Sequence, residues 1–521
     1  MCGILVSCSK HHTATTKHQT LVPRGPDQFE WVEQGDVSFL FHRLAIMDES
    51  SNGMQPFQSD NCTLVANAEI YNYKELKAML SSHRFESDSD CEVLLPLYRE
   101  LGLDMFSYLD AEFAIVLYDG NTQSIIAARD PIGIRPLFYG YLKHDRELLF
   151  ASEAKSLMGI VEQVIPFPPG HVYHNGHFTK FHDIDDVTSY HDHLFEDITL
   201  QIHKKLISAV HKRLDSDAPM GFLLSGGLDS SLVCAIAQRV SNTPIRTFAI
   251  GMDSDPIDLK YARDVANHIG SDHTEVTMTK EDVLGCLNDV IYALETYDIT
   301  TIRASIGMYL LARYIHQNTD IKVLLTGEVS DELFGYKYTD FAPTPEAFQA
   351  ESLKRVRELY QYDVLRADRC LAAHSLEARV PFADLDFVSY TLRIAPIFKM
   401  NKYRTGKFLL RRAFEGDYLP THILYRDKAA FSDAVGHSMV DHLKALAEST
   451  YDEHTYQIKR INYDPTPISK EALLYREMFE TYYPDHAHLI PGYWMPNKDW
   501  PGCNVNDPSA RVLSNYGNSG K

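Results

Sequence analysis

The stretch "MCGILVSC" at the start of the chain places a thiol, Cys2, directly behind Met1. A cysteine there is either a small buried apolar residue or a nucleophile that becomes the first residue once Met1 is removed. In the second case its own α-amino group, with a pKa of about 8, can act as the base that takes the thiol proton. The other motifs of the chain decide between the two interpretations.

A second motif lies in "GFLLSGGLDSSLVCAIAQRV", where an apolar stretch runs into Ser225–Ser231 and then into a helical pattern. Glycines let a backbone approach phosphate closely, and serine hydroxyls and N–H groups at a helix start point toward it. An ordinary strand, turn and helix uses the same residue types. No lysine follows the glycines, which excludes the G-x-x-x-x-G-K-[ST] loop. The motif resembles the pyrophosphate loop of enzymes that attack the α-phosphate of ATP.

Three carboxylates, Glu328, Asp331 and Glu332, end the apolar run of "VLLTGEVSDELFGY". Carboxylates packed together repel one another unless they are solvated or share a cation. The motif therefore predicts a magnesium and nucleotide site, although an acidic helix N-terminus also explains it. Because open α/β sheets bind ligands beyond the carboxyl ends of their strands, we expect this motif and Ser225–Ser231 to share one site.

Charged residues further along the chain are less specific. Asp363, Arg366 and Lys428 are each explained as surface ions. The run 399–412 carries six basic residues and no acid. A solvated helix face explains this run as well, so the sequence assigns it no role.

Polar clusters in the first part of the chain offer what hydrolysis of an amino-acid amide needs. Arg43 can form a bidentate pair with an α-carboxylate, and Asp90 can accept hydrogen bonds from an α-ammonium. Asn67 and the backbone N–H that follows it can form an oxyanion hole. In a turn-rich β segment, the alternative is that these clusters only form turns.

Two kinds of scaffold must position these residues. The first 180 residues alternate or run apolar as short strands at 37–41, 62–66, 113–118, 124–128 and 148–151, with helical patterns at 73–80 and 92–101. From about residue 198 helices alternate with buried strands at 221–224, 246–250 and 322–325. This second pattern predicts a parallel sheet covered by helices, with the boundary in the acidic stretch 183–192.

Composition excludes several classes of protein. A chain of 521 residues exceeds one ordinary core, and its net charge of −21 argues against nucleic acid or an anionic membrane as partner. The eight scattered cysteines include no C-x-x-C pair and signal neither a disulfide framework nor a zinc site. Polar residues Ser7, Ser9, Lys10, His11 and His12 follow soon after the start, which argues against a secretory signal, and no apolar run is long enough to span a bilayer. We therefore expect a cytoplasmic protein.

Taken in order, these motifs resemble the family of glutamine-dependent asparagine synthetases from about residue 2 to about residue 512. The resemblance implies an α+β N-terminal-nucleophile sandwich, the glutaminase domain, over residues 2–185. It implies an α/β parallel-sheet ATP-pyrophosphatase domain over residues 195–490, with an irregular tail over residues 491–521. The family also has an R-G-P-D element, so "LVPRG" at residues 21–25 is expected to be native sequence and not an engineered cleavage site.

The resemblance also implies roles for individual residues. Cys2 attacks the glutamine amide, with Asn67 and the Ala68 N–H at the oxyanion, and ammonia passes to the second domain through an internal tunnel. Glutamine is held by Arg43, Leu44, Ala45, Ile46, Met47, Asn67, Ala68, Glu69 and Asp90. ATP is held by Leu224, Ser225, Gly226, Gly227, Leu228, Asp229, Ser230, Ser231, Ile250, Thr326 and Gly327. Glu328, Asp331, Asp363 and Arg366 orient aspartate or its adenylate, Glu328 and Lys428 are catalytic, and Asp229 and Asp331 bind Mg²⁺.

Two residues replace glycines that the family has in its motifs. Ala68 stands in the N-G-E motif, and Val329 stands in S-G-E-G-S-D-E. A β-branched residue resists the left-handed backbone conformation that a glycine adopts easily. We therefore keep three alternatives beside a homodimeric, glutamine-dependent enzyme: one that uses only ammonia, a β-lactam-synthetase-like enzyme acting on another carboxylate, and a non-catalytic homologue.

Overall fold

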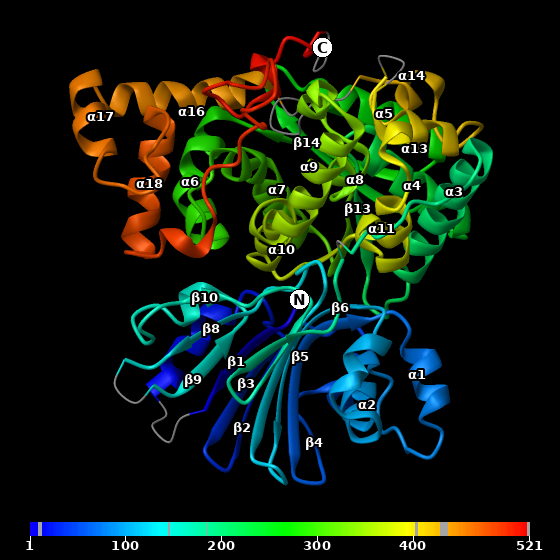
Figure 1. The fold of residues 1–521 in the computed structure, drawn as a ribbon, viewed down its shortest axis with the longest axis vertical. Helices are drawn as coiled ribbons and strands as arrows, with labels where there is room; N and C mark the ends of the chain where they lie inside the picture. The colour runs from blue at the N-terminus through cyan, green and yellow to red at the C-terminus, as the bar shows by residue number, and fades with distance from the viewer. Residues whose placement is uncertain (9–12, 144–145, 185, 402–404, 428–435, 518–521) are drawn as a thin grey trace.

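The computed structural model describes residues 1–8, 13–143, 146–184, 186–401, 405–427 and 436–517. Its first part contains two six-stranded antiparallel sheets, with strand orders β10-β8-β9-β1-β3-β2 and β12-β11-β7-β6-β5-β4 (Figure 1). The strands are β1 (Gly3–Ser7), β2 (Gln28–Gln34), β3 (Val37–Arg43), β4 (Phe57–Ser59), β5 (Cys62–Ile70), β6 (Ala111–Asp119), β7 (Ser124–Arg129), β8 (Phe138–Tyr141), β9 (Leu148–Ala151), β10 (Ile165–Pro166), β11 (His171–His174) and β12 (His177–Lys180).

The core of this part lies between the two sheets. Val6 and Phe39 of the first sheet belong to one buried apolar cluster with Val65 and Val116 of the second sheet. Helices α1 (Tyr73–Met79) and α2 (Leu94–Leu101) pack on the other face of the second sheet. The α+β sandwich is therefore confirmed, because alternate residues of the central strands face two different apolar layers.

Every strand and helix predicted for this part is present. The five predicted strands fall within β3, β5, β6, β7 and β9, and the two helical patterns correspond to α1 and α2. The predicted start of the second helix at residue 92 is two residues early, because Asp90–Val93 forms a 3-10 turn. The short strands β4, β8 and β10–β12 gave too few alternating residues to be recognised.

The second part contains a five-stranded parallel sheet in the order β15-β14-β13-β16-β17, which confirms the predicted α/β class. Its strands are β13 (Met220–Leu223), β14 (Arg246–Met252), β15 (Asp272–Met278), β16 (Val323–Leu325) and β17 (Glu377–Arg379). The two edge strands were not predicted. β15 is half-buried and polar, and β17 has only three residues, of which Glu377 and Arg379 are charged.

Helices surround this sheet and extend to one side of it (Figure 1). They are α3 (Phe195–Lys212), α4 (Leu228–Val240), α5 (Ile257–Ile269), α6 (Lys280–Leu294), α7 (Ile299–Asn318), α8 (Ser330–Phe334), α9 (Pro345–Glu358), α10 (Asp363–Ala372), α11 (Leu385–Leu392), α12 (Pro396–Lys399), α13 (Phe408–Ala413), α14 (Thr421–Leu424), α16 (His437–Thr450), α17 (Glu453–Arg460) and α18 (Lys470–Tyr482). None of the helices in the described residues is long and apolar enough to cross a membrane. Within the described part of residues 491–521, the chain forms neither α-helix nor strand.

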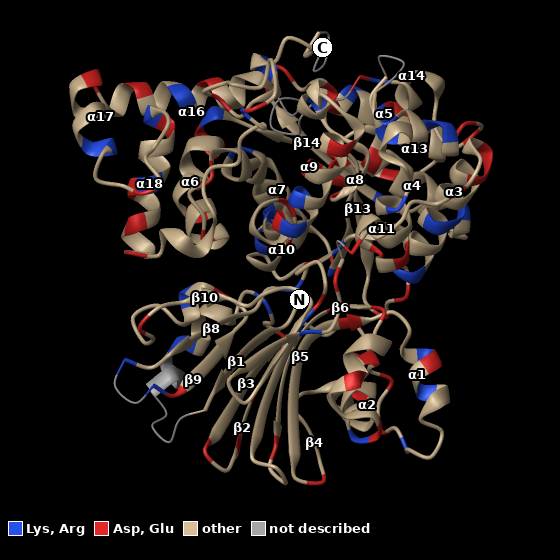
Figure 2. Ribbon diagram, viewed as in Figure 1, with Lys and Arg blue, Asp and Glu red and all other residues tan. Residues whose placement is uncertain are grey.

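Buried ion pairs join the two parts. Arg24, with 1% of its surface exposed, donates to both carboxylate oxygens of Asp368 in α10 at 2.8 and 3.0 Å and to Glu153 at 2.9 Å. Basic and acidic residues lie next to one another along α10 (Figure 2). Since Arg24 is buried and paired across the interface, the "LVPRG" stretch is an integral part of the fold.

Candidate functional sites

Cys2 lies directly before β1, with its thiol against the turn that follows β3. Its Sγ donates to the carbonyl oxygen of Leu44 at 3.7 Å. Burial raises the pKa of the thiol, while the chain's terminal ammonium and the bond to Leu44 lower it. In the full chain that ammonium belongs to Met1, which is fully buried with its nitrogen 3.6 Å from Glu377 Oε2. The thiol has its own α-amino group as neighbour only after Met1 is removed.

Arg43 ends β3 and is held by the loop that follows it. Its guanidinium donates to Gln28 Oε1 at 2.8 Å and to the backbone carbonyl oxygens of Ser50 at 2.6 Å and of Asp48. A Cβ atom on Gly53 would lie 2.4 Å from Arg43 Nη2, so a side chain there would displace the guanidinium from its present position. The residues 44–47, predicted to bind glutamine, follow Arg43 directly and are buried.

Asn67, Ala68 and Glu69 are consecutive residues of β5. Asn67 Nδ2 is buried, and no residue in the described part of the chain accepts a hydrogen bond from it. A buried amide donor without a partner is costly, which is the state expected of a group that donates to a bound oxyanion. Ala68 lies in the strand without a positive φ, so replacing glycine there strains nothing.

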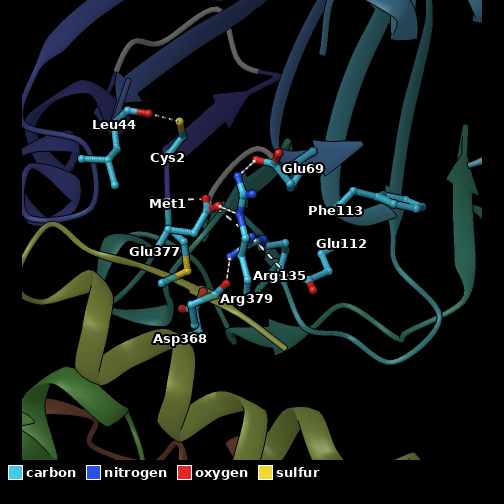
Figure 3. A network of polar contacts seen from close by, with 12 residues as sticks. Met1, Cys2, Leu44, Glu69, Glu112, Phe113, Arg135, Asp368, Glu377 and Arg379 are labelled. Atoms are coloured by element: carbon cyan, nitrogen blue, oxygen red, sulfur yellow. Dashed lines mark hydrogen bonds and ion pairs between the residues drawn. The ribbon is translucent and has the colours of Figure 1, made fainter. Parts of the chain in front are cut away.

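Two predicted glutamine ligands are already paired within the protein. Glu69 Oε2 lies 2.8 Å from Arg379 Nη2 of β17 (Figure 3). Asp90 Oδ2 accepts from the backbone N–H of Ile70 at 2.7 Å, and burial raises the pKa of this carboxyl. Glu69 of the first part therefore contacts the parallel sheet of the second part at its edge strand β17.

In the second part, the Ser225–Ser231 loop joins β13 to α4 as the sequence predicts. Gly226 has φ +69°, and a Cβ atom on it would lie 2.5 Å from the backbone nitrogen of Ala262. A Cβ atom on Gly327 would lie 2.7 Å from the backbone nitrogen of Ser230. The two motifs are thus packed backbone against backbone at one edge of the sheet, which only glycine permits.

A cavity of about 220 Å³ opens where these motifs meet. Of the residues predicted for ATP and aspartate it is lined by Leu224, Ser225, Gly227, Leu228, Asp229, Ser230, Ile250, Thr326, Gly327, Glu328, Asp331, Asp363 and Arg366. Two predicted ATP-binding residues, Gly226 and Ser231, do not line the cavity. Gly226 packs against α5, and Ser231 is fully buried in α4. Lys428 lies outside the described residues.

The acidic end of the cavity is balanced by one arginine. Arg366 Nη2 lies 2.5 Å from Glu328 Oε2 and 3.1 Å from Asp363 Oδ1. Burial, together with the carboxylates of Asp363 and Asp331, raises the pKa of Glu332 well above its usual range. This end can therefore take a substrate that brings both a positive and a negative charge.

Basic residues that the sequence did not assign to the site also line the cavity. Lys407 and Arg411 line the cavity, as does Arg426, which donates to the carbonyl oxygen of Gly226 at 3.0 Å and lies 2.8 Å from Asp258. Lys407 and Arg411 belong to the basic run 399–412. The sequence feature that could have identified them is the absence of any acid from that run, since a solvated helix face normally carries both positive and negative charges.

The structure also brings residues from distant segments into the wall. Thr300 and Arg303 of α7 line the cavity, and so do Trp494 and residues 508–510 of the C-terminal segment. Val329, in the place of a family glycine, has φ 79° and is 2% exposed at the start of α8. This is the left-handed conformation that the glycine motif predicts.

Both parts of the chain match known families. The family model for asparagine synthase matches residues 201–344 and 340–501, and that for the glutamine amidotransferase domain matches residues 1–171. A probable glutamine-hydrolysing asparagine synthetase from Acanthamoeba polyphaga mimivirus is 41% identical and covers 94% of each chain. The glutamine-hydrolysing asparagine synthetase of Zea mays is 39% identical over 99% of this chain and 94% of its own, and that of Cricetulus griseus is 40% identical over 96% and 95%.

Proposed function

Because the chain belongs to the family of glutamine-hydrolysing asparagine synthetases, we propose that it makes asparagine from aspartate, ATP and glutamine, and releases AMP, pyrophosphate and glutamate. The observation that carries this proposal is the cavity in which the serine-glycine loop and the acidic motif meet. It offers hydroxyl and N–H donors for phosphates on one wall and paired carboxylates with Arg366 at the other end.

The first half-reaction takes place at Cys2 once Met1 is removed. The α-amino group takes the thiol proton, and sulfur attacks the carboxamide carbon of glutamine. The oxyanion accepts from Asn67 Nδ2, for which the described residues provide no other acceptor. The α-ammonium of Cys2 then gives that proton to the departing nitrogen, so that the C–N bond breaks and ammonia leaves, and water hydrolyses the thioester to glutamate. Arg43 and Asp90 hold the α-carboxylate and the α-ammonium of the substrate.

The second half-reaction takes place in the cavity. The β-carboxylate of aspartate attacks the α-phosphorus of ATP and pyrophosphate departs from the Ser225–Ser231 loop. Ammonia then attacks the acyl carbon of β-aspartyl-AMP, and AMP is the leaving group. Glu328 accepts the proton that the attacking nitrogen loses, and Arg366 holds Glu328 in place. Lys428 is assigned a catalytic role by its position in the family motif alone.

Asp229 and Asp331 form a donor set that fits Mg²⁺. Their carboxylates converge on one cationic nitrogen, that of Lys407. No group of three or more potential ligands occurs in the described residues, so Mg²⁺ would take its other oxygens from phosphates and water. When bound, the ion neutralises charge on the phosphates.

The surroundings of the enzyme follow from the same assignment. A cytoplasmic location agrees with the eight cysteines, all of which are free thiols.

We also propose a homodimer, by analogy with the family. Native mass spectrometry measures this directly, and a monomer at micromolar concentration would contradict it.

The test is aspartate-dependent release of pyrophosphate from ATP, with glutamine supplied in one arm and ammonium in the other. We expect asparagine in both arms. Cys2→Ala should abolish turnover with glutamine and leave turnover with ammonium, because only the first half-reaction uses the thiol. Asp229→Ala should abolish both. Absence of pyrophosphate from both arms of the wild type overturns the proposal. Turnover with another carboxylate, but not with aspartate, would overturn the assignment of aspartate as the substrate.

A further inference from the structure

The ammonium group of Lys407 lies in the middle of the proposed metal site. Its Nζ is 2.8 Å from both carboxylate oxygens of Asp229 and 2.5 Å from Asp331 Oδ1. Ser330 Oγ lies 3.0 Å from the same nitrogen and donates to Asp229 Oδ1 at 2.7 Å. The side chain of Lys407 is 2% exposed. One buried cation thus holds together the carboxylates of two separate motifs.

Backbone conformation and hydrogen bonds fix the position of the Lys407 side chain. Lys407 is the residue before α13 and has a left-handed backbone, with φ 56°. Arg411, one turn later, donates to the carbonyl oxygen of Gly406 at 2.6 Å and also to that of Leu424. The start of α13 is therefore anchored on both sides of the lysine, while the cavity lies beyond its ammonium group.

Two carboxylates this close repel each other strongly in a buried site unless a cation lies between them. An ammonium group and Mg²⁺ satisfy the same oxygen atoms, so one excludes the other. Lysine brings a single charge and three donors, whereas Mg²⁺ requires six oxygens that the two carboxylates cannot supply. The phosphates of ATP provide both the missing oxygens and a new partner for the displaced ammonium.

We propose that Lys407 occupies the cation position between Asp229 and Asp331 in the free enzyme and exchanges with Mg²⁺ when the metal arrives with ATP. This inference rests on the proposed metal role of the two aspartates. The lysine keeps the two motifs together while the site is empty of nucleotide. It also makes metal binding conditional on nucleotide, so free Mg²⁺ at cellular concentration does not occupy the site alone.

The experiment measures binding of Mn²⁺, the paramagnetic probe for Mg²⁺, to the full chain without nucleotide, by the decrease of the free-ion electron paramagnetic resonance signal. We expect weak binding by the wild type and at least tenfold tighter binding by Lys407→Met, because the ammonium group no longer occupies the position between Asp229 and Asp331. Lys407→Arg should behave like the wild type, since it keeps the charge. Lys74→Met is the matched control, because it removes an exposed lysine from a lysine–aspartate pair outside the cavity.

The increase in Mn²⁺ affinity caused by Lys407→Met must disappear in the double variant that also carries Asp229→Asn. Equal Mn²⁺ affinity of the wild type and Lys407→Met overturns the exchange, and so does a gain that survives Asp229→Asn. Lys407→Gln replaces Lys407→Met if the latter is insoluble. Failure of the metal assignment is measured separately: if Asp229→Asn and Asp331→Asn leave binding of Mn²⁺ with ATP unchanged, the two aspartates do not hold the metal.

Discussion

The backbone of Val329 shows what replacing a glycine costs at a single residue. A β-branched side chain in the left-handed region costs about 1–2 kcal/mol, and Val329 has φ 79°. Its side chain is nevertheless buried in the core cluster that contains Leu325 and Leu333. Burial of a valine stabilises by about 2 kcal/mol. The two effects are of similar size, which explains how this position accepts valine.

Val329→Gly is therefore expected to change the free energy of unfolding by less than about 1 kcal/mol, since relief of backbone strain offsets lost burial. Val323→Gly is the control, because Val323 is fully buried in β16 with an extended backbone. That change relieves no strain and should cost about 3 kcal/mol. Chemical denaturation compares the two variants, and equal losses would show that Val329 is not strained.

Among the helices, α12 buries a lysine at its last residue. Lys399 is 3% exposed, and its Nζ donates to two neutral acceptors, Gln349 Oε1 at 3.0 Å and the carbonyl oxygen of Thr391 at 3.2 Å. Burial lowers the pKa of this lysine to about 7. The last residue of this short helix is therefore a buried amine that is hydrogen-bonded to neutral acceptors.

Lys399 gives the protein a measurable pH dependence. Its pKa is about 7 in the folded state and about 10.4 in the unfolded chain. Between these values the unfolded chain binds the extra proton, so the wild type becomes more stable as pH rises. Lys399→Met lacks this contribution. The stability of the wild type relative to the variant should increase by about 2 kcal/mol between pH 7 and pH 9.

Denaturant titrations at pH 6, 7, 8 and 9 measure this difference. Lys74→Met, which changes an exposed lysine, serves as control and should differ from the wild type by the same amount at each pH. A constant difference for Lys399→Met as well would mean that Lys399 stays charged in the folded protein.

At the scale of the whole molecule, buried ion pairs hold the two parts together. Glu377 of β17 accepts from Arg379 Nε at 3.0 Å, and Arg135 Nη2 of the first part lies 3.5 Å from its other oxygen (Figure 3). Burial alone would raise the pKa of Glu377, but Arg135, the terminal ammonium and Arg379 lower it to about 2. Since Arg379 also pairs with Glu69, the network runs from the glutaminase residues to the synthetase sheet.

Acid should therefore remove the stabilisation that Glu377 gives the interface. Because the pKa of Glu377 falls from 4.5 to about 2 on folding, its contribution is complete above pH 4.5 and is lost as pH falls toward 2. Glu377→Gln should lower the free energy of unfolding by about 3 kcal/mol at pH 7. The difference from the wild type should close on acidification.

Unfolding titrations from pH 7 to pH 2.5 follow this difference. Asp386→Asn, which changes an exposed carboxylate paired with Lys205, is the control and should show no comparable closing. A difference for Glu377→Gln that is independent of pH would contradict the assignment of the ion pairs to the stability of the interface.

Features that depend on local pattern could be predicted from the sequence alone. Alternation in β3 and β5–β7, and the apolar strands before Ser225–Ser231 and the acidic motif, follow from residues near one another in the chain. The motifs around Cys2, Asn67 and Asp229 were recognisable because their chemistry requires particular residue types at fixed spacing. The replacement of a glycine by Val329 was visible in the same way.

Which charged residues form ion pairs with one another could be seen only in the tertiary structure. Nothing near Lys407 in the chain indicates that its ammonium group reaches Asp229, 178 residues earlier. The pairing of Glu69 with Arg379 and the arrival of Trp494 at the cavity wall are equally non-local. The sequence does not distinguish a solvated charged residue from a buried and paired one. The burial of such a residue and the identity of its partner depend on how distant segments of the chain pack.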